Sequence, residues 1–391
     1  MTFADIHAKL DWDGLCSAIC ASTCADVDAA LRQSATGARC TLAQLRALLS
    51  PAAGARLEEM ARLAHAHTLR RFGRTVQLFA PLYISNECHN VCTYCGFSLT
   101  NKIPRKTLST SELLREAELL RGFGFGHVLV VSGEAPAHAG PAQLETVLRN
   151  LRPRFAGLSL EVQPLDTADY ARLRQCGLSS VLVYQETYHR EAYTRHHLRG
   201  RKTDFVYRLE TPDRIARAGI RKLGLGALYG LEDWRADTYH TALHLDYLER
   251  AYWQTRYSVS FPRLRPHAGD ATAGSIPHPV GERELAQAIC ALRLFNHEAE
   301  LSLSTRERPH FRDNAMRLGI TTMSAGAKTN PGGYAEASAA APGAKTLEQF
   351  SMSDERLPDE IVAMLHRNNY EPVWKDWDAC YDNATVGCDA P

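Results

Sequence analysis

The 391-residue sequence predicts an α/β fold: a closed (β/α)8 TIM-type barrel with a helical N-terminal extension and a short C-terminal extension. The main observation is that eight short β-like runs alternate with amphipathic helical segments, the pattern of parallel βαβ units. Eight such units fit a closed barrel, and chemistry-bearing residues follow several of the runs, where active sites of such barrels lie.

Residues 1–72 are predicted as the N-terminal extension. Thr41 is expected to cap a helix over Leu42–Leu49, and a second helix is expected over residues 55–71. The barrel is expected over residues 73–329. Its strands are predicted at residues 77–85, 127–132, 158–163, 180–185, 222–227, 257–261, 301–306 and 320–325. Its helices are predicted at residues 111–122, 141–152, 167–176, 212–218, 238–252 and 282–295.

Two of these runs carry polar residues on one face. Ser159, Glu161 and Gln163 alternate with apolar residues in the third run, and the seventh run, residues 301–306, repeats this pattern up to Arg306. A strand in a parallel barrel is usually apolar on both faces. The alternation therefore indicates a lumen wide enough for a polar ligand. Residues 330–391 are expected to pack on the barrel as the C-terminal extension.

Composition excludes several classes of function. The chain has 45 basic and 44 acidic residues, so its charge gives no reason to expect nucleic-acid binding. It has no apolar run of membrane length and no evident signal peptide. Eleven cysteines without an export signal favour metal binding in a reducing cytoplasm over disulfides.

The most informative motif is CxxxCxxC, formed by Cys88, Cys92 and Cys95. Three thiolates can hold three corners of a four-iron cluster and leave the fourth iron open, whereas four thiolates suit electron transfer. The alternatives are buried structural cysteines and a zinc site, which lacks a nearby fourth ligand. Three further cysteines recur at every fourth position and are expected to form a packing stripe on one helix: Cys16, Cys20 and Cys24.

With Tyr94 just before its last cysteine, the motif resembles the signature of radical S-adenosylmethionine (radical SAM) enzymes. The resemblance implies one [4Fe–4S] cluster whose open iron binds SAM, followed by cleavage of SAM to methionine and a 5′-deoxyadenosyl radical. Residues 83–88, 184–189 and 301–307 resemble the aromatic amino-acid lyase branch. Residues 259–266 and 373–378 look most like the tyrosine lyases of thiazole (thiamine) biosynthesis.

This resemblance implies cleavage of the Cα–Cβ bond of L-tyrosine to 2-iminoacetate and p-cresol. It also implies a thiazole synthase partner and a flavodoxin or ferredoxin electron donor. Cys380 and Cys388 do not match the spacing that holds a second cluster in the hydrogenase-maturing relative. The alternatives are a related lyase acting on tryptophan and a non-catalytic iron–sulfur protein for electron transfer or redox sensing.

The substrate residues follow from the predicted lumen and the resemblance. Arg306 is expected to bind the substrate carboxylate with its guanidinium fork. The alternative is an ion pair of Arg306 with Glu307 or Asp313. Tyr83 and Ser324 are expected near the substrate amine, with ordinary barrel packing as the alternative.

The resemblance also assigns residues to the methionine moiety of SAM. Gly133 and Glu134 are expected to receive its amino group, since a carboxylate suits an ammonium and glycine permits close backbone approach. Tyr184 and Arg208 are expected to meet its carboxylate.

The rest of SAM is assigned in the same way. Glu161 and Gln163 are expected at the ribose hydroxyls, and Tyr94 and Gly226 near the adenine. His197 is a candidate proton donor to the departing p-cresyl fragment. It lies in a basic run, residues 195–202, whose alternative interpretation is a solvated loop.

Overall fold

The predicted barrel is present. The computed structural model describes residues 2–265, 276–337 and 348–374. Eight parallel strands follow one another around the barrel, and pairing of β10 with β1 closes it. They are β1 (Thr75–Ser85), β3 (His127–Ser132), β4 (Gly157–Glu161), β5 (Leu178–Leu182), β7 (Lys222–Gly226), β8 (Arg256–Ser260), β9 (Glu300–Leu303) and β10 (Thr322–Ser324). Each overlaps one of the eight predicted runs, which confirms the fold class.

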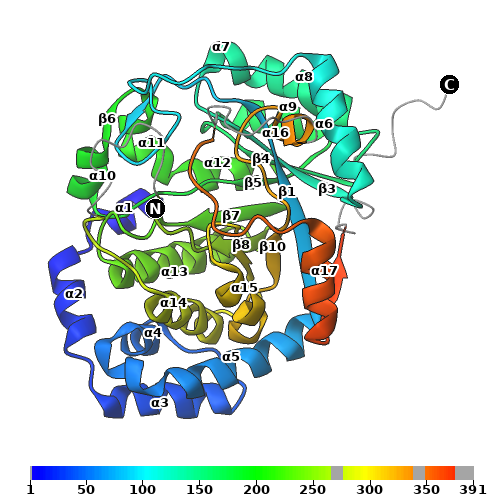
Figure 1. Cartoon of the computed structure of the whole chain (residues 1–391). Coiled ribbons are helices and arrows are strands. Elements are labelled where there is room, and N and C mark those ends of the chain that lie inside the picture. The colour runs from blue at the N-terminus through cyan, green and yellow to red at the C-terminus, as the bar shows by residue number, and fades with distance from the viewer. Residues whose placement is uncertain (1, 266–275, 338–347, 375–391) are drawn as a thin grey trace.

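Helices surround the strands (Figure 1). The six predicted ones are α6 (Thr110–Gly122), α8 (Pro141–Leu151), α9 (Thr167–Gln175), α12 (Thr211–Arg217), α13 (Trp234–Ala251) and α14 (Glu282–Phe295). Short helices that the prediction did not include lie in the loops: α7 (Pro136–Ala139), α10 (Arg190–His196), η2 (Arg201–Thr203), α11 (Phe205–Leu209), α15 (Pro309–Ala315) and η3 (Met316–Leu318). Most of these follow the carboxyl ends of strands, so they shape the mouth of the barrel.

The N-terminal extension is helical, as predicted, and runs along the barrel beside α13 and α14 (Figure 1). It comprises α1 (Phe3–His7), α2 (Trp12–Cys20), α3 (Cys24–Ala35), α4 (Leu42–Leu49), η1 (Pro51–Arg56) and α5 (Leu57–Phe72). Thr41 caps α4 with a capping box. The predicted stripe of Cys16, Cys20 and Cys24 is wrong, because α2 and α3 meet at 88° and the last two of these cysteines are exposed.

The described part of the C-terminal extension contains α16 (Gly333–Ala337), α17 (Pro358–Arg367) and β11 (Glu371–Val373). β11 pairs in parallel with the first residues of β1, outside the closed barrel. Trp374 then packs edge-on against Phe125, with ring centroids 5.2 Å apart. Cys380 and Cys388, discussed above, lie outside the described residues.

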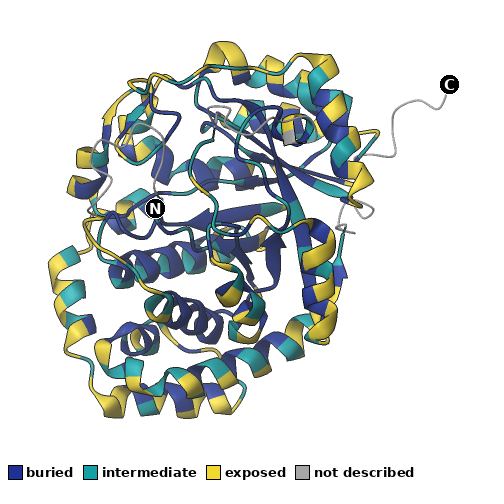
Figure 2. Ribbon diagram, in the orientation of Figure 1, coloured by how far each residue is buried: buried dark blue, intermediate teal, exposed yellow. Residues whose placement is uncertain are grey.

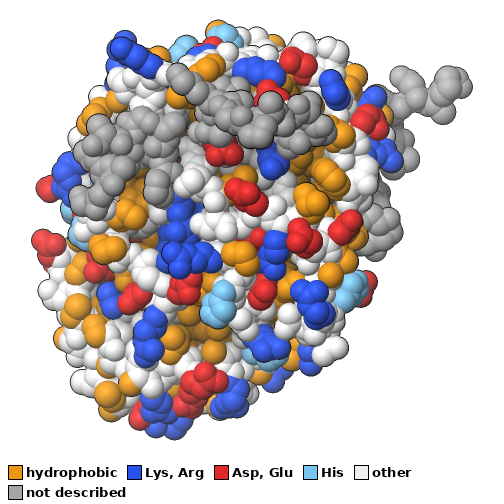
Figure 3. Space-filling model, in the orientation of Figure 1, with side chains coloured by type: hydrophobic (Ala, Val, Ile, Leu, Met, Phe, Trp, Pro, Cys, Tyr) orange, Lys and Arg blue, Asp and Glu red, His pale blue; other side chains and the backbone are white. Residues whose placement is uncertain are grey.

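Burial follows the layers of the barrel. The strands and the inner faces of the helices are buried, and the outer helix faces are exposed (Figure 2). Inside the barrel, at the amino-terminal end of the strands, Lys222 and Glu300 form an ion pair of 2.6 Å. Acidic and basic side chains are interspersed over the face shown in Figure 3. Within the described ranges, no single helix is long and apolar enough to cross a membrane, although α2 and α3 together reach that length and composition with a sharp bend between them.

Candidate active site

A cavity lies inside the barrel toward the carboxyl ends of its strands. Its two walls differ in chemistry. Strands β1 and β3 contribute apolar side chains, including Phe79, Leu129 and Val131, whereas β8 and β9 contribute hydroxyls, including Ser260 and Ser302. The predicted polar lumen is therefore present, with an apolar patch on the wall formed by β1 and β3.

The three motif cysteines line an adjoining cavity. Cys88 and Cys92 are buried, Cys95 is half-buried, and all three are free thiols. The loop that carries them is held from both ends. Strand β2 (Val91–Cys92) pairs with β6 (His197–Arg199), and the Gln349 side-chain amide approaches Cys95 Sγ at 3.7 Å. Because the two cavities share lining residues, including Cys95, a group bound by the cysteines would face the barrel lumen.

The cysteine cavity fits an iron–sulfur cluster with a ligand beside it. Across the described part of the chain, no three His, Cys, Asp or Glu side chains are arranged to hold a single metal ion. The three thiols nevertheless border one cavity, as ligands of a multi-iron cluster would. Gly133 borders it as well, and an added Cβ there would lie 3.2 Å from Cβ of Cys88 and 2.2 Å from the Glu87 carbonyl oxygen. Only glycine fits between the cysteine loop and the end of β3.

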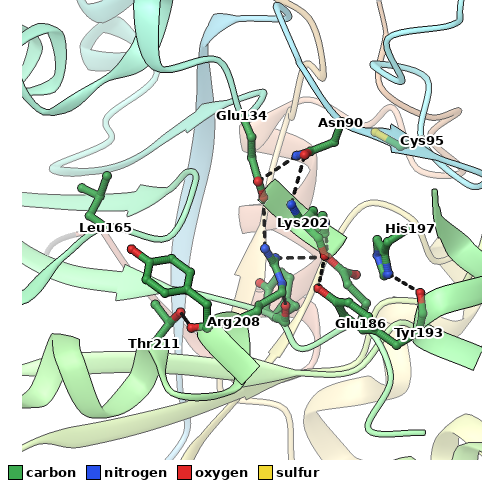
Figure 4. A network of polar contacts seen from close by, with 12 residues as sticks. Asn90, Cys95, Glu134, Leu165, Glu186, Tyr193, His197, Lys202, Arg208 and Thr211 are labelled. Carbon is green, nitrogen blue, oxygen red and sulfur yellow. Dashed lines mark hydrogen bonds and ion pairs between the residues drawn. The ribbon is translucent and has the colours of Figure 1, made fainter. Parts of the chain in front are cut away.

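Four charged side chains, two buried (Glu186 and Arg208) and two half-buried (Glu134 and Lys202), form a network beside the cysteines (Figure 4). Arg208 lies between two carboxylates, with its Nη1 3.0 Å from Glu134 Oε1 and its Nη2 3.3 Å from Glu186 Oε1. Lys202 Nζ is 2.7 Å from the same Glu186 oxygen. Burial opposes ionisation of Glu186, but the two cations outweigh it and hold its pKa below the usual range. The structure thus brings together the predicted residues Glu134 and Arg208. The Glu134 carboxylate can bind the ammonium of an amino-acid zwitterion, and the Arg208 guanidinium can bind its carboxylate.

Arg306 lines the lumen, as predicted, and carries no carboxylate partner among the described residues. Its guanidinium carbon lies 3.4 Å from the centroid of the Phe350 ring, and its Nη1 donates a hydrogen bond of 3.4 Å to the Arg263 carbonyl. The alternative ion pairs do not form, because Glu307 binds Arg263 and Arg265 while Asp313 binds Arg356. The guanidinium is therefore available to a ligand.

Tyr83, Ser324 and Glu161 border the same cavity. The Tyr83 hydroxyl donates a hydrogen bond of 2.8 Å to Gln349 Oε1, and Ser324 Oγ accepts one of 3.0 Å from the Thr305 N–H. Burial raises the pKa of Glu161 to about 7, against the opposing effect of Arg306. A carboxyl that changes charge near neutral pH therefore lies in the lumen.

The other predicted residues divide into two groups. Tyr184 lines both cavities, and its hydroxyl donates to Ser260 Oγ at 3.2 Å; a Cβ at Gly226 would lie 2.9 Å from the Tyr184 ring. Gln163 lines neither of these two cavities, because β4 ends at Glu161 and the Gln163 amide turns to the Ala139 carbonyl at 2.9 Å; it borders a smaller neighbouring cavity with Glu134 and Arg208.

Tyr94 and His197 form a pair. The Tyr94 hydroxyl, at the cavity wall, lies 2.6 Å from Nε2 of His197, whose Nδ1 lies 2.7 Å from the Tyr193 carbonyl. Burial, with Lys202 nearby, lowers the pKa of His197 to about 3. His197 is thus neutral and stands behind Tyr94, a place that favours positioning of Tyr94 over direct proton donation.

Sequence reasoning assigned no role to four residues of the site. Lys202 belongs to the basic run interpreted as a solvated loop, yet its half-buried ammonium is paired with Glu186. Gln349 and Phe350 come from the C-terminal extension and line the main cavity. Glu186 adopts a positive φ of 73°, a conformation that non-glycine residues rarely hold outside functional sites. No periodicity marks these residues, since tertiary contacts alone bring them in.

Comparison with known proteins agrees with this geometry. Residues 82–242 match the Radical SAM superfamily, and residues 260–371 match the Biotin and Thiamin Synthesis associated domain. The chain is 50% identical to 2-iminoacetate synthase of Escherichia coli (strain K12) over 98% of its own length and 99% of that protein. It is 48% identical to 2-iminoacetate synthase of Salmonella typhimurium (strain LT2), with the same coverage.

Among solved structures, HydG, a maturase of the [FeFe]-hydrogenase, superposes with a TM-score of 0.86 at 30% identity, covering 95% of this chain and 81% of that one. Methylornithine synthase (PylB) superposes with a TM-score of 0.72 at 19% identity, covering 91% of this chain and 99% of that one, which shows the shared fold. The sequence matches extend over both the barrel and its extensions. The chain therefore belongs to the radical SAM superfamily and, within it, to the family of 2-iminoacetate synthases.

Proposed function

We propose that this protein is a radical SAM lyase that cleaves the Cα–Cβ bond of L-tyrosine to 2-iminoacetate and p-cresol, while SAM becomes methionine and 5′-deoxyadenosine. The observation that carries the proposal is the pair of joined cavities, one bordered by three free cysteines and the other by the unpaired guanidinium of Arg306. A cluster site and a carboxylate site thus open onto each other. The relatives at 50% and 48% identity bear the name of this activity.

Membership of the radical SAM superfamily implies a [4Fe–4S] cluster and SAM. We propose one cluster, held by Cys88, Cys92 and Cys95. When bound together, the cluster and SAM supply a carbon-centred radical that removes a hydrogen atom from the substrate. Glu134 and Arg208 are placed to exchange their mutual ion pair for the ammonium and carboxylate of the methionine moiety.

The remaining residues act on tyrosine. The guanidinium of Arg306 would bind its carboxylate in a charge-assisted contact, which stabilises binding by about 1.5–3 kcal/mol. Tyr83 and Ser324 would lie beside the substrate amine. Gln349 and Phe350 form part of the cavity wall and would limit the access of water and stray reductant to a reactive fragment.

The chemistry sets the partners. Cleavage of SAM consumes one electron, and conversion of the p-cresyl fragment to p-cresol consumes a further electron and a proton. We propose a flavodoxin or ferredoxin as donor. We also propose that 2-iminoacetate, a hydrolysable imine, passes to a thiazole synthase partner, and that both steps occur in the reducing cytoplasm, where free thiols persist.

The test is anaerobic incubation of the reconstituted protein with dithionite, SAM and tyrosine. The expected products are 5′-deoxyadenosine, p-cresol and glyoxylate, the hydrolysis product of 2-iminoacetate. Absence of both 5′-deoxyadenosine and p-cresol would favour a non-catalytic iron–sulfur protein. Indole-derived products from tryptophan, with none from tyrosine, would reassign the substrate.

A further inference from the structure

One hydroxyl at the floor of the main cavity makes no hydrogen bond to the described part of the chain. Ser302 lies on the inner face of β9 with its side chain against the cavity, and the residue is only 7% exposed. Three strand residues on the β8–β10 wall contribute hydroxyls to this cavity. Ser260 Oγ accepts from Tyr184 and Ser324 Oγ accepts from the Thr305 N–H, whereas Ser302 Oγ has no hydrogen-bond partner among the described residues.

Ser302 Oγ faces the open space of the cavity, so a ligand that fills the cavity takes solvent away from this hydroxyl. That loss costs free energy unless the ligand supplies a hydrogen bond in return. Below Ser302, the ion pair of Lys222 with Glu300 closes the barrel. Ser302 therefore marks the deep end of the ligand space, and a polar group of the ligand is needed there.

The opposite end of the space is defined by Arg306. Ser302 precedes Arg306 by four residues, so their Cα atoms are at most about 13 Å apart along an extended chain. The arginine side chain can bring its guanidinium closer to Ser302 than that. An amino acid whose carboxylate is bound by Arg306 would extend its side chain toward Ser302. The intervening wall from β1 and β3 is apolar, with Phe79 and Leu129 lining it. An aromatic ring would pack against this wall and carry a para substituent to the floor.

We infer that Ser302 is a specificity residue: its hydroxyl hydrogen-bonds the phenolic oxygen of the substrate and selects tyrosine over phenylalanine. This inference rests on the proposed function. The phenolic hydroxyl both donates and accepts, so it satisfies Ser302 in either orientation. Phenylalanine would leave Ser302 without a partner and bring a ring edge to a polar floor. A site built to bond a substrate hydroxyl discriminates against the analogue that lacks it.

The test is binding of tyrosine and phenylalanine to cluster- and SAM-loaded protein without reductant, so that no turnover occurs, measured by calorimetry. Ser302→Ala is compared with wild type and with Ser258→Ala. Ser258 is a matched control, because it is a buried serine on the neighbouring strand β8 that does not line the cavity. We expect Ser302→Ala to weaken tyrosine binding by roughly 3- to 10-fold, the contribution of one uncharged hydrogen bond, and to leave phenylalanine binding unchanged or tighter. Ser258→Ala should bind both as wild type does.

Two readouts separate a specific effect from a structural one. Phenylalanine binding reports an intact pocket in the same variant, and Ser302→Thr, which keeps a hydroxyl, should restore the preference for tyrosine. Equal changes for tyrosine and phenylalanine, or no change for either, would overturn the inference. Failure of the wild-type protein to release p-cresol from tyrosine would instead overturn the proposed function on which the inference rests.

Discussion

Replacing Arg306 by alanine is the most direct test of how the lumen holds its substrate. The guanidinium rests on Phe350 and the Arg263 carbonyl, and no described carboxylate is paired with it. Its removal therefore leaves no acid without a salt-bridge partner. Arg306 also lowers the pKa of Glu161, so its removal favours the protonated form of that carboxyl. No unpaired carboxylate is created, and the expected defect lies in substrate binding rather than in folding.

The size of the defect follows from the contact that is lost. A charge-assisted hydrogen-bonded contact is worth about 1.5–3 kcal/mol, and about 1.4 kcal/mol corresponds to a factor of ten. We therefore expect kcat/KM for tyrosine to fall by roughly 10- to 150-fold in Arg306→Ala. Arg306→Lys should fall between this variant and wild type, because an ammonium keeps the charge but loses the two-pronged geometry.

The assay compares two activities of the same preparation. p-Cresol formation reports tyrosine turnover, and 5′-deoxyadenosine formed without tyrosine reports the cluster and SAM site. Arg308→Ala is the control, because Arg308 is exposed two residues away. Equal losses of the two activities in Arg306→Ala, or a kcat/KM that stays close to wild type, would refute the assignment of Arg306 to the substrate carboxylate.

Three further predictions concern the cluster, the loop that holds it and the titrating carboxyl. Cys92→Ala should abolish the visible absorbance of the reconstituted cluster while Cys16→Ala leaves it intact; a cluster lost with Cys16 would contradict the assignment. Gly133→Ala would place a Cβ 2.2 Å from a backbone carbonyl oxygen, so we expect the free energy of unfolding to fall by about 1–3 kcal/mol and cluster loading to be poor. Gly54→Ala is the control, because its Cβ would have open space around it; stability and cluster loading should both stay as in wild type. The folded state keeps Glu161 protonated up to about pH 7, whereas the unfolded chain loses this proton at a lower pH. The free energy of unfolding should therefore fall as pH rises from 5 to 7, by on the order of 1 kcal/mol per pH unit. Urea unfolding of the apoprotein should show this slope reduced in Glu161→Gln, and an unchanged slope would mean that Glu161 titrates normally.

The fold was predictable because local patterns carry it. Eight alternating units imply a barrel, and the alternation of polar and apolar residues over 301–306 correctly placed Ser302 and Arg306 at the lumen, although β9 itself ends at Leu303. The same reasoning extended the third strand too far. Because β4 ends at Glu161, Gln163 no longer follows the strand alternation and lies outside both cavities.

The site was predictable only in part, because a charged side chain in a polar loop can point into the protein even where the composition of the loop suggests exposure to solvent. The run around Lys202 reads as solvated on charge alone, yet Glu186, at the turn after β5, draws the ammonium inward. Gln349 lies more than 250 residues from Tyr83 and Cys95, which it contacts. No spacing rule connects such partners, so only the folded chain reveals them.

The pairing of β1 also has a consequence for how the protein is made. The carboxyl half of β1 pairs with β3, but its amino half is completed by β10 and β11, strands that lie about 245 and 295 residues later in the chain. Contacts of such sequence separation form slowly. The barrel therefore stays open until nearly the whole chain has been synthesised, and Gln349 reaches the cysteine loop equally late. Iron delivered to the thiols during synthesis would meet a solvent-exposed loop, so the cluster is best installed after the C-terminal extension has docked.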